Sequence, residues 1–300
     1  QVEKEVLLAM RDAMFHRGPD GAGFHIESSL GLGHRRLSII DLSEKGNQPM
    51  LNIDRSLCVI FNGEIYNFKD LRRELEKKGH YFQSQSDTEV LLHGFEEWGE
   101  ELPARLYGMF AFAIWDFKQK QLFLCRDRLG IKPLYCYLSK NKLLFASEIK
   151  ALLASGVVSD MDPDAVAQNM ILRYVPGQKT LFKNIKMFPP GYWAKFDNKG
   201  MHEKHCWWSL KNCSQHGQFG QKQTEERFHE LLEEAVVDRL VADVPLGTFL
   251  SGGIDSATIA AMMARNSEQV VSFTFGFGKE FDETEEAKRI AGEIGTDNIA

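Results

Sequence analysis

The chain has 300 residues, of which 43% are hydrophobic and 26% charged, a composition typical of a folded globular protein with about two domains. Its formal net charge of −6 argues against a general nucleic-acid or membrane-surface role, because phosphate-rich partners require concentrated Lys and Arg. No apolar run approaches the ~20 residues of a membrane helix, and residues 1–5 lack the basic start and apolar core of a signal peptide, so a cytoplasmic protein is predicted.

Strands dominate the first half of the chain. Their signal is a run of β-forming residues bounded by turn residues. Such runs lie at residues 31–40, 58–66, 108–116, 121–126, 133–138 and 142–147. Because short polar links join the last four runs, we expect them to form an antiparallel meander.

Helices interrupt these strands. Asn67 is expected to cap the first helix, which runs to Lys78. Ser86 and Glu89 have the spacing of a capping box and therefore predict the start of a second helix. A short third helix is predicted over residues 162–173.

The second half of the chain follows a polar stretch at residues 209–222, which is rich in Gly, Ser and Gln and typical of a linker. Thr224 is expected to cap a helix that runs to about Leu240. A strand, a helix and a strand are predicted next, and this βαβ order indicates the start of a parallel sheet. The predicted segments are 248–250, 257–265 and 270–277. The predicted domains are 1–205 and 223–300, with a linker at 206–222.

The strongest chemical signal is the sequence LSGGIDS at residues 250–256, between a predicted strand and a predicted helix. Two glycines allow a tight turn with exposed N–H groups, and the helix N-terminus adds a partial positive charge. These groups and the two serine hydroxyls suit an anion, with pyrophosphate the best fit. Neither a Walker A loop nor a dinucleotide fingerprint is present. A plain strand-to-helix turn is the alternative interpretation.

Five short motifs occur in the first half of the chain. They are HRGPDG (16–21), RRLSII (35–40), NGEIYN (62–67), SDTE (86–89) and RDRLGIKPLY (126–135). Each alone is explained by turn chemistry or surface charge, and NGEIYN is expected to interrupt a strand with a flexible turn. Together, in this order, they closely resemble the class II glutamine amidotransferase domain of asparagine synthetases. The resemblance continues through ASEIKAL (146–152), YVPG (174–177) and PPG (189–191) into the loop at 250–256, which resembles the SGG-x-DS loop of ATP pyrophosphatases.

This resemblance implies an α+β domain of the N-terminal-nucleophile type with four αββα layers, followed by the start of an α/β doubly wound ATP-pyrophosphatase domain. It also implies an ATP-dependent ligase that converts aspartate to asparagine through β-aspartyl-AMP, with ammonia supplied by glutamine hydrolysis. Glutamine, aspartate, ATP and Mg²⁺ are the implied partners and cofactors, nucleic acid and membrane are not, and a homodimer is left open.

The resemblance also implies roles for single residues. Arg36 would form a salt bridge with the glutamine α-carboxylate, and Asp87 would anchor the α-ammonium. Asn62 and Gly63 would form the oxyanion hole. The remaining implied glutamine contacts are Glu64 and the backbone of Leu37, Ser38, Ile39 and Ile40.

For the nucleotide, the implied binding residues are Leu250, Ser251, Gly252, Gly253, Asp255, Ser256 and Phe275. Asp255 would help to organise Mg²⁺ and pyrophosphate, and Leu250 and Phe275 would contact the nucleotide through their backbones. Phe275 ends the predicted strand at 270–277, and open α/β sheets bind ligands at the carboxyl ends of their strands. A core position is the alternative interpretation of its side chain.

The nucleophile of the family is a terminal cysteine, but this chain starts at Gln1. The resemblance therefore implies a missing upstream strand with Met-Cys-Gly and a truncated second domain, so we expect no glutamine hydrolysis by the chain as given. The cysteines form no C-x-x-C pair and have no clear histidine partner, which predicts reduced, partly buried thiols and no zinc site. They are Cys58, Cys125, Cys136, Cys206 and Cys213.

Two other functions are left open. One is a paralogous amidotransferase acting on another carboxylate, as in polysaccharide or antibiotic biosynthesis; the intact Arg36, Asn62 and Asp87 disfavour a lactam-forming relative, which would not use glutamine. The other is a non-catalytic binding module.

Overall fold

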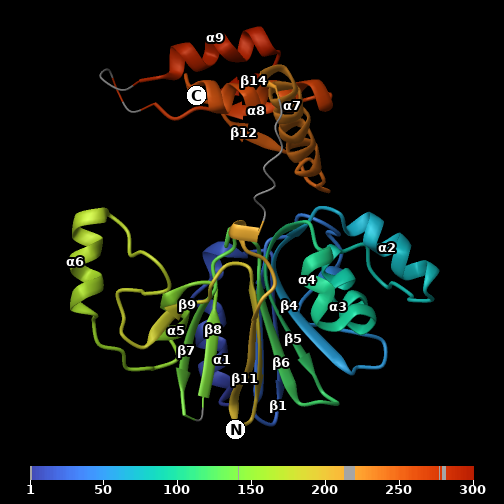
Figure 1. Ribbon diagram of the computed structural model, residues 1–300, viewed down its shortest axis with the longest axis vertical. Coiled ribbons are helices and arrows are strands. Elements are labelled where there is room, and N and C mark those ends of the chain that lie inside the picture. Colours follow the sequence, from blue (N-terminus) through green and yellow to red (C-terminus); the bar gives the residue numbers. More distant parts are fainter. Residues whose placement is uncertain (1, 141, 213–219, 277, 279–281) are drawn as a thin grey trace. The chain divides into compact units, whose positions relative to one another are not determined.

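The chain divides into two units, Gln1–Ser214 and Gln215–Ala300 (Figure 1). The computed structural model describes residues 2–140, 142–212, 220–276, 278 and 282–300. Within these ranges, none of the helices combines the length and the apolar character needed to cross a bilayer. Residues 213–219 of the predicted linker, with Cys213, lie outside the described part of the chain.

A six-stranded antiparallel sheet forms the centre of the first unit, in the order β11-β10-β6-β5-β4-β3. Its strands are β3 (Met50–Leu51), β4 (Leu57–Ile65), β5 (Gly108–Asp116), β6 (Gln121–Arg126), β10 (Tyr192–Asp197) and β11 (Gly200–Cys206). Side chains alternate in size along β5, so that Phe112 lies on one face and Ala113 on the other. The aromatic face is covered by α3 (Asp87–Trp98), whose Phe95 ring lies 5.0 Å from that of Phe123.

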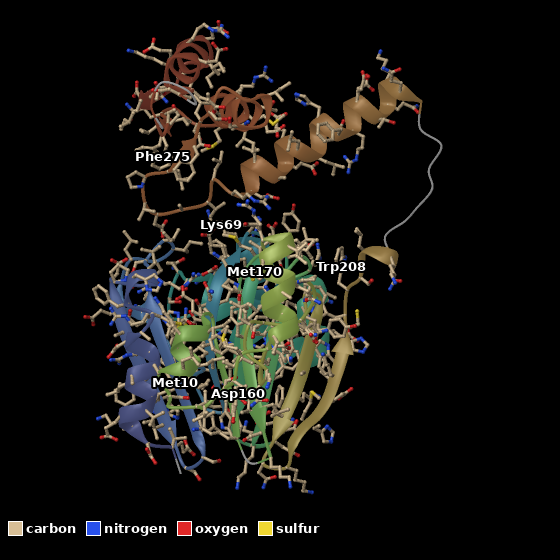
Figure 2. All side chains as sticks on the ribbon, turned by 90° about the vertical axis from the view of Figure 1, so that its left-hand side faces the viewer. Met10, Lys69, Asp160, Met170, Trp208 and Phe275 are labelled. Carbon is tan, nitrogen blue, oxygen red and sulfur yellow. The ribbon has the colours of Figure 1, made fainter. Side chains whose placement is uncertain are left out.

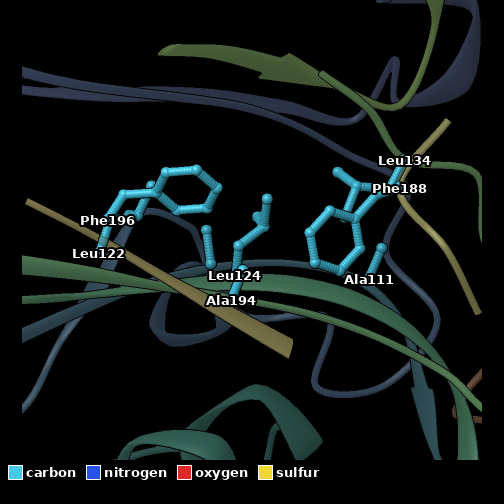
Figure 3. Close-up of a cluster of buried hydrophobic side chains, with 8 residues drawn as sticks. Ala111, Leu122, Leu124, Leu134, Phe188, Ala194 and Phe196 are labelled. Carbon is cyan, nitrogen blue, oxygen red and sulfur yellow. The ribbon is translucent and has the colours of Figure 1, made fainter. Parts of the chain in front are cut away.

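A second layer of strands packs over the alanine face of the large sheet. It contains the three-stranded sheet β8-β7-β9 and the hairpin of β1 and β2. These strands are β1 (Gly21–Glu27), β2 (Leu30–Arg36), β7 (Tyr135–Ser139), β8 (Lys142–Ala146) and β9 (Ile185–Met187). Figure 3 shows the buried cluster on this face, against which Cys136 of β7 and Phe145 of β8 pack. Small alanines at its base let the two sheets approach closely.

Helices cover both outer faces of this pair of sheets (Figure 1). On the side of the small sheet, Met10 of one helix and Leu152 of another pack on Ile185. The helices of the unit are α1 (Lys4–Asp12), α2 (Phe68–Lys77), α3, α4 (Leu102–Arg105), α5 (Ile149–Leu153) and α6 (Pro163–Leu172). This order of layers confirms the predicted αββα architecture.

The predicted antiparallel meander is wrong. β5 pairs with β6 in the large sheet and β7 pairs with β8 in the small sheet, while the second neighbour of β6 is β10. The link between β6 and β7 crosses from one sheet to the other. Buried Asp127 organises this crossing, because its carboxylate accepts the N–H groups of Phe110, Leu129, Ile131 and Lys132.

The predicted turn at residues 62–67 is also wrong. Residues 62–65 continue β4 and pair without interruption with β5. Conversely, the strand predicted over residues 31–40 ends at Arg36, and residues 37–40 form a loop. The end of the strand predicted over 58–66 agrees with β4, and only the interruption predicted within it is wrong; both corrected positions border the cavity described below.

Two helix caps differ from their prediction. Asn67 lies at the predicted N-cap position of α2, but its side chain makes no capping hydrogen bond, because its amide donates to the Arg105 carbonyl and accepts the Tyr107 N–H. Ser86 does cap α3 by accepting the Thr88 N–H, but no capping box forms. The reason is that the Glu89 carboxylate instead accepts N–H groups of residues 83 and 84.

The second unit contains a parallel sheet in the order β12-β13-β14, which confirms the predicted βαβ start of an α/β domain. Its elements are α7 (Gln221–Asp238), β12 (Gly247–Phe249), α8 (Ile254–Asn266), β13 (Val271–Phe273), α9 (Thr284–Ile294) and β14 (Asp297–Ile299). Thr224 is not the cap of α7, because that helix begins at Gln221 and the Thr224 hydroxyl donates to the Gly220 carbonyl. The strand predicted over 270–277 stops at Phe273, and residue 277 lies outside the described ranges.

Candidate functional site

A cavity of about 250 Å³ opens in the first unit where segments distant in the sequence meet. These segments are the loop after β2, the second half of β4, the start of α3 and the residues around Lys132 and Ser147. Most of the predicted glutamine-site residues line it: Arg36, Leu37, Ile39, Ile40, Asn62, Gly63, Glu64 and Asp87. Ser38 is outside this lining, and its N–H donates to the Asp20 carboxylate at 2.9 Å.

Arg36 is buried and holds the loop that follows it. One terminal nitrogen donates to the Ser43 carbonyl at 2.7 Å and to Asn47 Oδ1 at 3.1 Å. The other donates to the carbonyls of Ile40, at 3.3 Å, and Asp41. The guanidinium therefore fixes the loop's shape, and the predicted salt bridge to a ligand carboxylate stays a prediction.

The loop is also tied to the start of α3. Asp41 adopts a left-handed backbone conformation, and its carboxylate accepts the N–H groups of Ser43, at 3.0 Å, and Gln85, at 2.7 Å. Because Gln85 lies two residues before Asp87, this contact couples the loop wall of the cavity to its acidic wall. The N–H groups of Ile39 and Ile40 make no hydrogen bond to another described residue and are available to a ligand.

The middle wall is the second half of β4. The Asn62 amide donates to the Ser147 hydroxyl at 3.2 Å, which orients the amide along the cavity. Gly63 lies against the neighbouring strand so closely that a Cβ atom would come 2.1 Å from the Met109 carbonyl oxygen. This close approach is the reason for glycine at position 63. Their predicted oxyanion-hole role remains a prediction.

Asp87 is the acid of the cavity and begins α3. It is 5% exposed, and its carboxylate accepts the Ile65 N–H at 3.0 Å. Burial raises the pKa of Asp87 from an ordinary value of 3.8 to about 7, against the opposing effect of the Ile65 hydrogen bond, and the charge of Glu64 raises it further. Within the described residues, no Lys, Arg or His forms an ion pair with it. A buried carboxylate of this kind is suited to receive a cation from a ligand.

Several lining residues were assigned no role from the sequence, among them Arg17, His34, Lys132 and Ser147. Burial lowers the pKa of His34 to about 4, and its ring nitrogen lies 3.0 Å from the Phe61 carbonyl oxygen, so neutral His34 donates to that carbonyl. Burial also lowers the pKa of Lys132, while the charge of Glu64 opposes this shift. The motifs HRGPDG, RDRLGIKPLY and ASEIKAL contain three of these residues, but only the fold shows that they meet.

None of the cysteines that the structure describes lines the cavity. Burial raises the pKa of the Cys58 and Cys136 thiols to about 12 and that of Cys125 well above its usual range. Thiols of this kind are protonated and unreactive at neutral pH. Cys206 is exposed, and all four described cysteines are free; their reduced state stays a prediction.

The loop at residues 251–256 lies at the end of β12 and the start of α8. Ser251 and Ser256 shape it, with their hydroxyl oxygens 2.9 Å apart and the Gly253 N–H donating to Ser251 Oγ at 3.3 Å. No side chain from the described part of the chain caps α8, so the first N–H groups of that helix are left for another acceptor. The Gly252 N–H donates to the Glu283 carboxylate at 3.3 Å, which shows that an anionic oxygen fits this loop.

The other predicted nucleotide residues differ in their settings. Leu250 is buried, its N–H donates to the Phe273 carbonyl, and its own carbonyl accepts the Thr274 hydroxyl. Phe275 is 65% exposed (Figure 2), so its side chain is not part of the core. Asp255 is exposed in the first turn of α8, where its carboxylate faces solvent.

Two segments of the chain match known protein families. Residues 1–208 match the family model described as a glutamine amidotransferase domain. Residues 227–300 match the family model described as asparagine synthase.

Curated relatives match most of the chain. Asparagine synthetase (glutamine-hydrolyzing) 1 of Bacillus subtilis (strain 168) is 37% identical over 304 residues, covering 99% of this chain and 47% of the relative. Asparagine synthetase (glutamine-hydrolyzing) 3 of the same organism is 39% identical over 274 residues, covering 89% of this chain and 44% of the relative. A putative asparagine synthetase (glutamine-hydrolyzing) 2 of Methanocaldococcus jannaschii is 35% identical over 308 residues, covering 95% of this chain and 59% of the relative. The chain spans about half the length of these relatives.

Proposed function

This chain belongs to the glutamine amidotransferase domain family, and we propose that it carries the glutamine pocket and the pyrophosphate loop of a glutamine-hydrolysing asparagine synthetase. In that enzyme, ammonia released from glutamine would amidate aspartate that has been activated by ATP. Residues 1–205 would form the glutamine domain and residues 223–300 the start of the synthetase domain.

The observation that carries the proposal is that buried Asp87 and the Asn62 amide of β4 line the same cavity. An amino acid in the cavity would place its α-ammonium at Asp87, with Glu64 adding a second negative charge. Its side-chain amide would lie along β4, where the Asn62 amide and the Gly63 N–H can stabilise a developing oxyanion. Both groups line one cavity of about 250 Å³, a size that suits a short amino acid with a terminal amide.

The α-carboxylate of that amino acid would meet the loop after β2. Arg36 lies at the base of the loop and adds positive charge there. Because its terminal nitrogens already hold loop carbonyls, we propose that Arg36 acts mainly by presenting the N–H groups of Ile39 and Ile40. This differs from the direct salt bridge that the resemblance implies.

In the second unit, the loop at residues 251–256 would hold the pyrophosphate part of ATP. Its uncapped helix N-terminus fits a polyphosphate, whose oxygen would replace the Glu283 carboxylate as the acceptor of the Gly252 N–H. Asp255 is the carboxylate in this loop that could hold Mg²⁺, which would neutralise charge on the phosphates when bound. The backbone next to Phe275 would border the nucleotide at the carboxyl end of β13.

An alternative keeps this glutamine pocket but changes the acceptor carboxylate from aspartate to another acid. The described residues do not decide between the acceptors, since none of them has been assigned to an acceptor site. A comparison of amidated products from aspartate and from other acids, using the longer protein, would decide between them.

The pocket is tested by calorimetric titration of the chain with L-glutamine at pH 8. We expect binding, with affinity at least about tenfold weaker in Asp87→Asn or for glutaramic acid, which lacks the α-ammonium. Asp164→Asn, on exposed α6, is the matched control and should bind like the unmodified chain. Failure of L-glutamine to bind, or equal affinity for glutaramic acid, would rule out the proposed pocket.

The same sample tests the chemistry. Because no described cysteine lines the cavity, we expect glutamine to be bound without release of glutamate. Glutamate release above background would show that another residue serves as the nucleophile.

A further inference from the structure

A second group of chemically active side chains lies outside the cavity, on α3 and the loop before it. His93 and Glu96 are one turn apart on α3, and His80 lies in the loop that follows α2. One ligand atom from each of the three residues lies within 4.8 Å of the other two. None of the three side chains faces the cavity.

The distances within the group suit a metal ion. The Nδ1 atoms of both imidazoles point to the same carboxylate oxygen, Glu96 Oε2, at 3.3 Å from His80 and 2.8 Å from His93. Bonds of about 2.1 Å in a tetrahedral arrangement separate neighbouring ligand atoms by about 3.4 Å. Small side-chain movements would therefore bring all three atoms to bonding distance of one ion.

A second layer of contacts is already in place. The far ring nitrogen of His80 lies 3.4 Å from Glu97 Oε2, and that of His93 lies 3.6 Å from Glu89 Oε1. His93 is 3% exposed, and its Nε2 atom has no hydrogen-bond partner among the described residues. Metal-bound histidines almost always direct the other ring nitrogen to such a carboxylate, which fixes the tautomer. The second oxygen of Glu96 accepts the Asn52 amide at 2.6 Å.

We propose that His80, His93 and Glu96 form a zinc-binding site with water as the fourth ligand. Two imidazoles and one carboxylate suit Zn²⁺, whereas Mg²⁺ and Ca²⁺ prefer oxygen ligands throughout. The carboxylates of Glu89 and Glu97 complete a negatively charged surrounding for a divalent cation. The pattern of cysteines in the sequence predicted no zinc site. The site proposed here contains no cysteine, so that pattern gave no information about it.

The ion would fasten the α2–α3 loop to α3. This loop leads directly to Ser86 and Asp87, and the Glu89 carboxylate binds its N–H groups at Gln83 and Ser84. Zinc would thus stabilise the loop between α2 and α3, which supports the acidic wall of the cavity. The ion itself would not contact the ligand in the cavity. Its expected effect is on the stability of the first unit, not on the chemistry of glutamine.

The test uses the full chain, freed of metal by a chelator and without an affinity tag that binds metal. Titration with ZnCl₂ should show one site, and a saturating excess should raise the melting temperature of the first unit by about 5 °C or more. Cobalt substituted for zinc should give the visible absorption bands of a tetrahedral N/O site. Absence of stoichiometric binding would overturn the proposal.

Variants locate the site. His80→Asn and Glu96→Gln should each weaken zinc binding at least about tenfold and reduce the melting shift at a fixed zinc concentration. His202→Asn and Cys206→Ser change exposed residues of β11 and are the controls, which should bind zinc as the unmodified chain does. Glu96 is the most exposed of the three side chains and His80 is partly exposed, so each replacement tests the site even if the other variant does not fold. Unchanged affinity in His80→Asn would place the bound zinc elsewhere.

Discussion

Replacement of Asp87 by Asn should stabilise the first unit at alkaline pH, although it removes an acid from the helix start. The introduced amide retains an oxygen that can accept the Ile65 N–H, and its nitrogen can donate to Ser86 Oγ, 3.5 Å from the present carboxylate. What the substitution eliminates is a buried charge. Asp87 is 5% exposed, so solvent screening reduces that cost very little.

The magnitude follows from the shift of the pKa of Asp87 from 3.8 to about 7. Between these values the folded unit binds a proton that the unfolded chain has lost, so the stability contributed by this group falls as pH rises. Three pKa units correspond to about 4 kcal/mol in total. About 3 kcal/mol of this is lost between pH 5 and pH 8.5, because roughly two units separate pH 5 from the folded pKa.

The assay is urea unfolding of the unmodified chain and of Asp87→Asn at pH 5 and pH 8.5. All five tryptophans lie in the first unit, so tryptophan fluorescence reports the unfolding of that unit. Other titrating groups are common to both proteins and cancel in the difference. We expect the advantage of Asp87→Asn to grow by about 3 kcal/mol between the two pH values, whereas Asp164→Asn should show no such growth. An advantage that does not change with pH would refute the buried-charge argument.

Two further predictions concern packing and thiols. Gly63→Ala should destabilise the first unit by about 2 kcal/mol or more, because its Cβ would come 2.1 Å from the Met109 carbonyl oxygen. Urea unfolding measures the loss of stability, and a variant as stable as the unmodified chain would contradict the prediction. Iodoacetamide at pH 8 should label exposed Cys206 but not Cys58 or Cys136, because burial raises the pKa of these two thiols to about 12. Peptide mass spectrometry identifies the labelled cysteines. Labelling of Cys58 in the folded chain would contradict the prediction.

Local sequence signals predicted most elements of the fold. β5 and β6 have the predicted bounds, because alternating or continuous apolar residues end sharply at polar turns. What the sequence could not show was which strands share a sheet. The link from β6 to β7 is short and polar like a hairpin link, but buried Asp127 bonds its N–H groups and directs the chain into the other sheet. Such a tertiary contact leaves no periodic signal.

Some residues of the candidate site were predictable from the sequence, but their contacts were not, because the contacts depend on tertiary structure. The order of short motifs indicated which residues belong together, and the structure places Arg36, Asn62 and Asp87 along one cavity. The motifs did not show what each group contacts. The guanidinium of Arg36 is directed to loop carbonyls, and the sequence NGE continues a strand where its composition suggested a turn. Polar residues with several possible partners can be assigned only when the neighbouring segments are known.

The burial of Asp87 supports the proposed glutamine pocket more directly than any motif does. An acid in the first turn of a helix is normally stabilised by the helix dipole, and Asp87 also accepts the Ile65 N–H, yet its pKa is still raised to about 7. Folding therefore places the Asp87 carboxylate where its negative charge is unfavourable. The neighbouring charge of Glu64 makes ionisation of Asp87 still less favourable. Such a residue is expected where a bound ligand supplies a cation. An ammonium group bound at Asp87 would reverse the shift and bind most strongly above pH 7, where Asp87 is ionised before the ligand arrives.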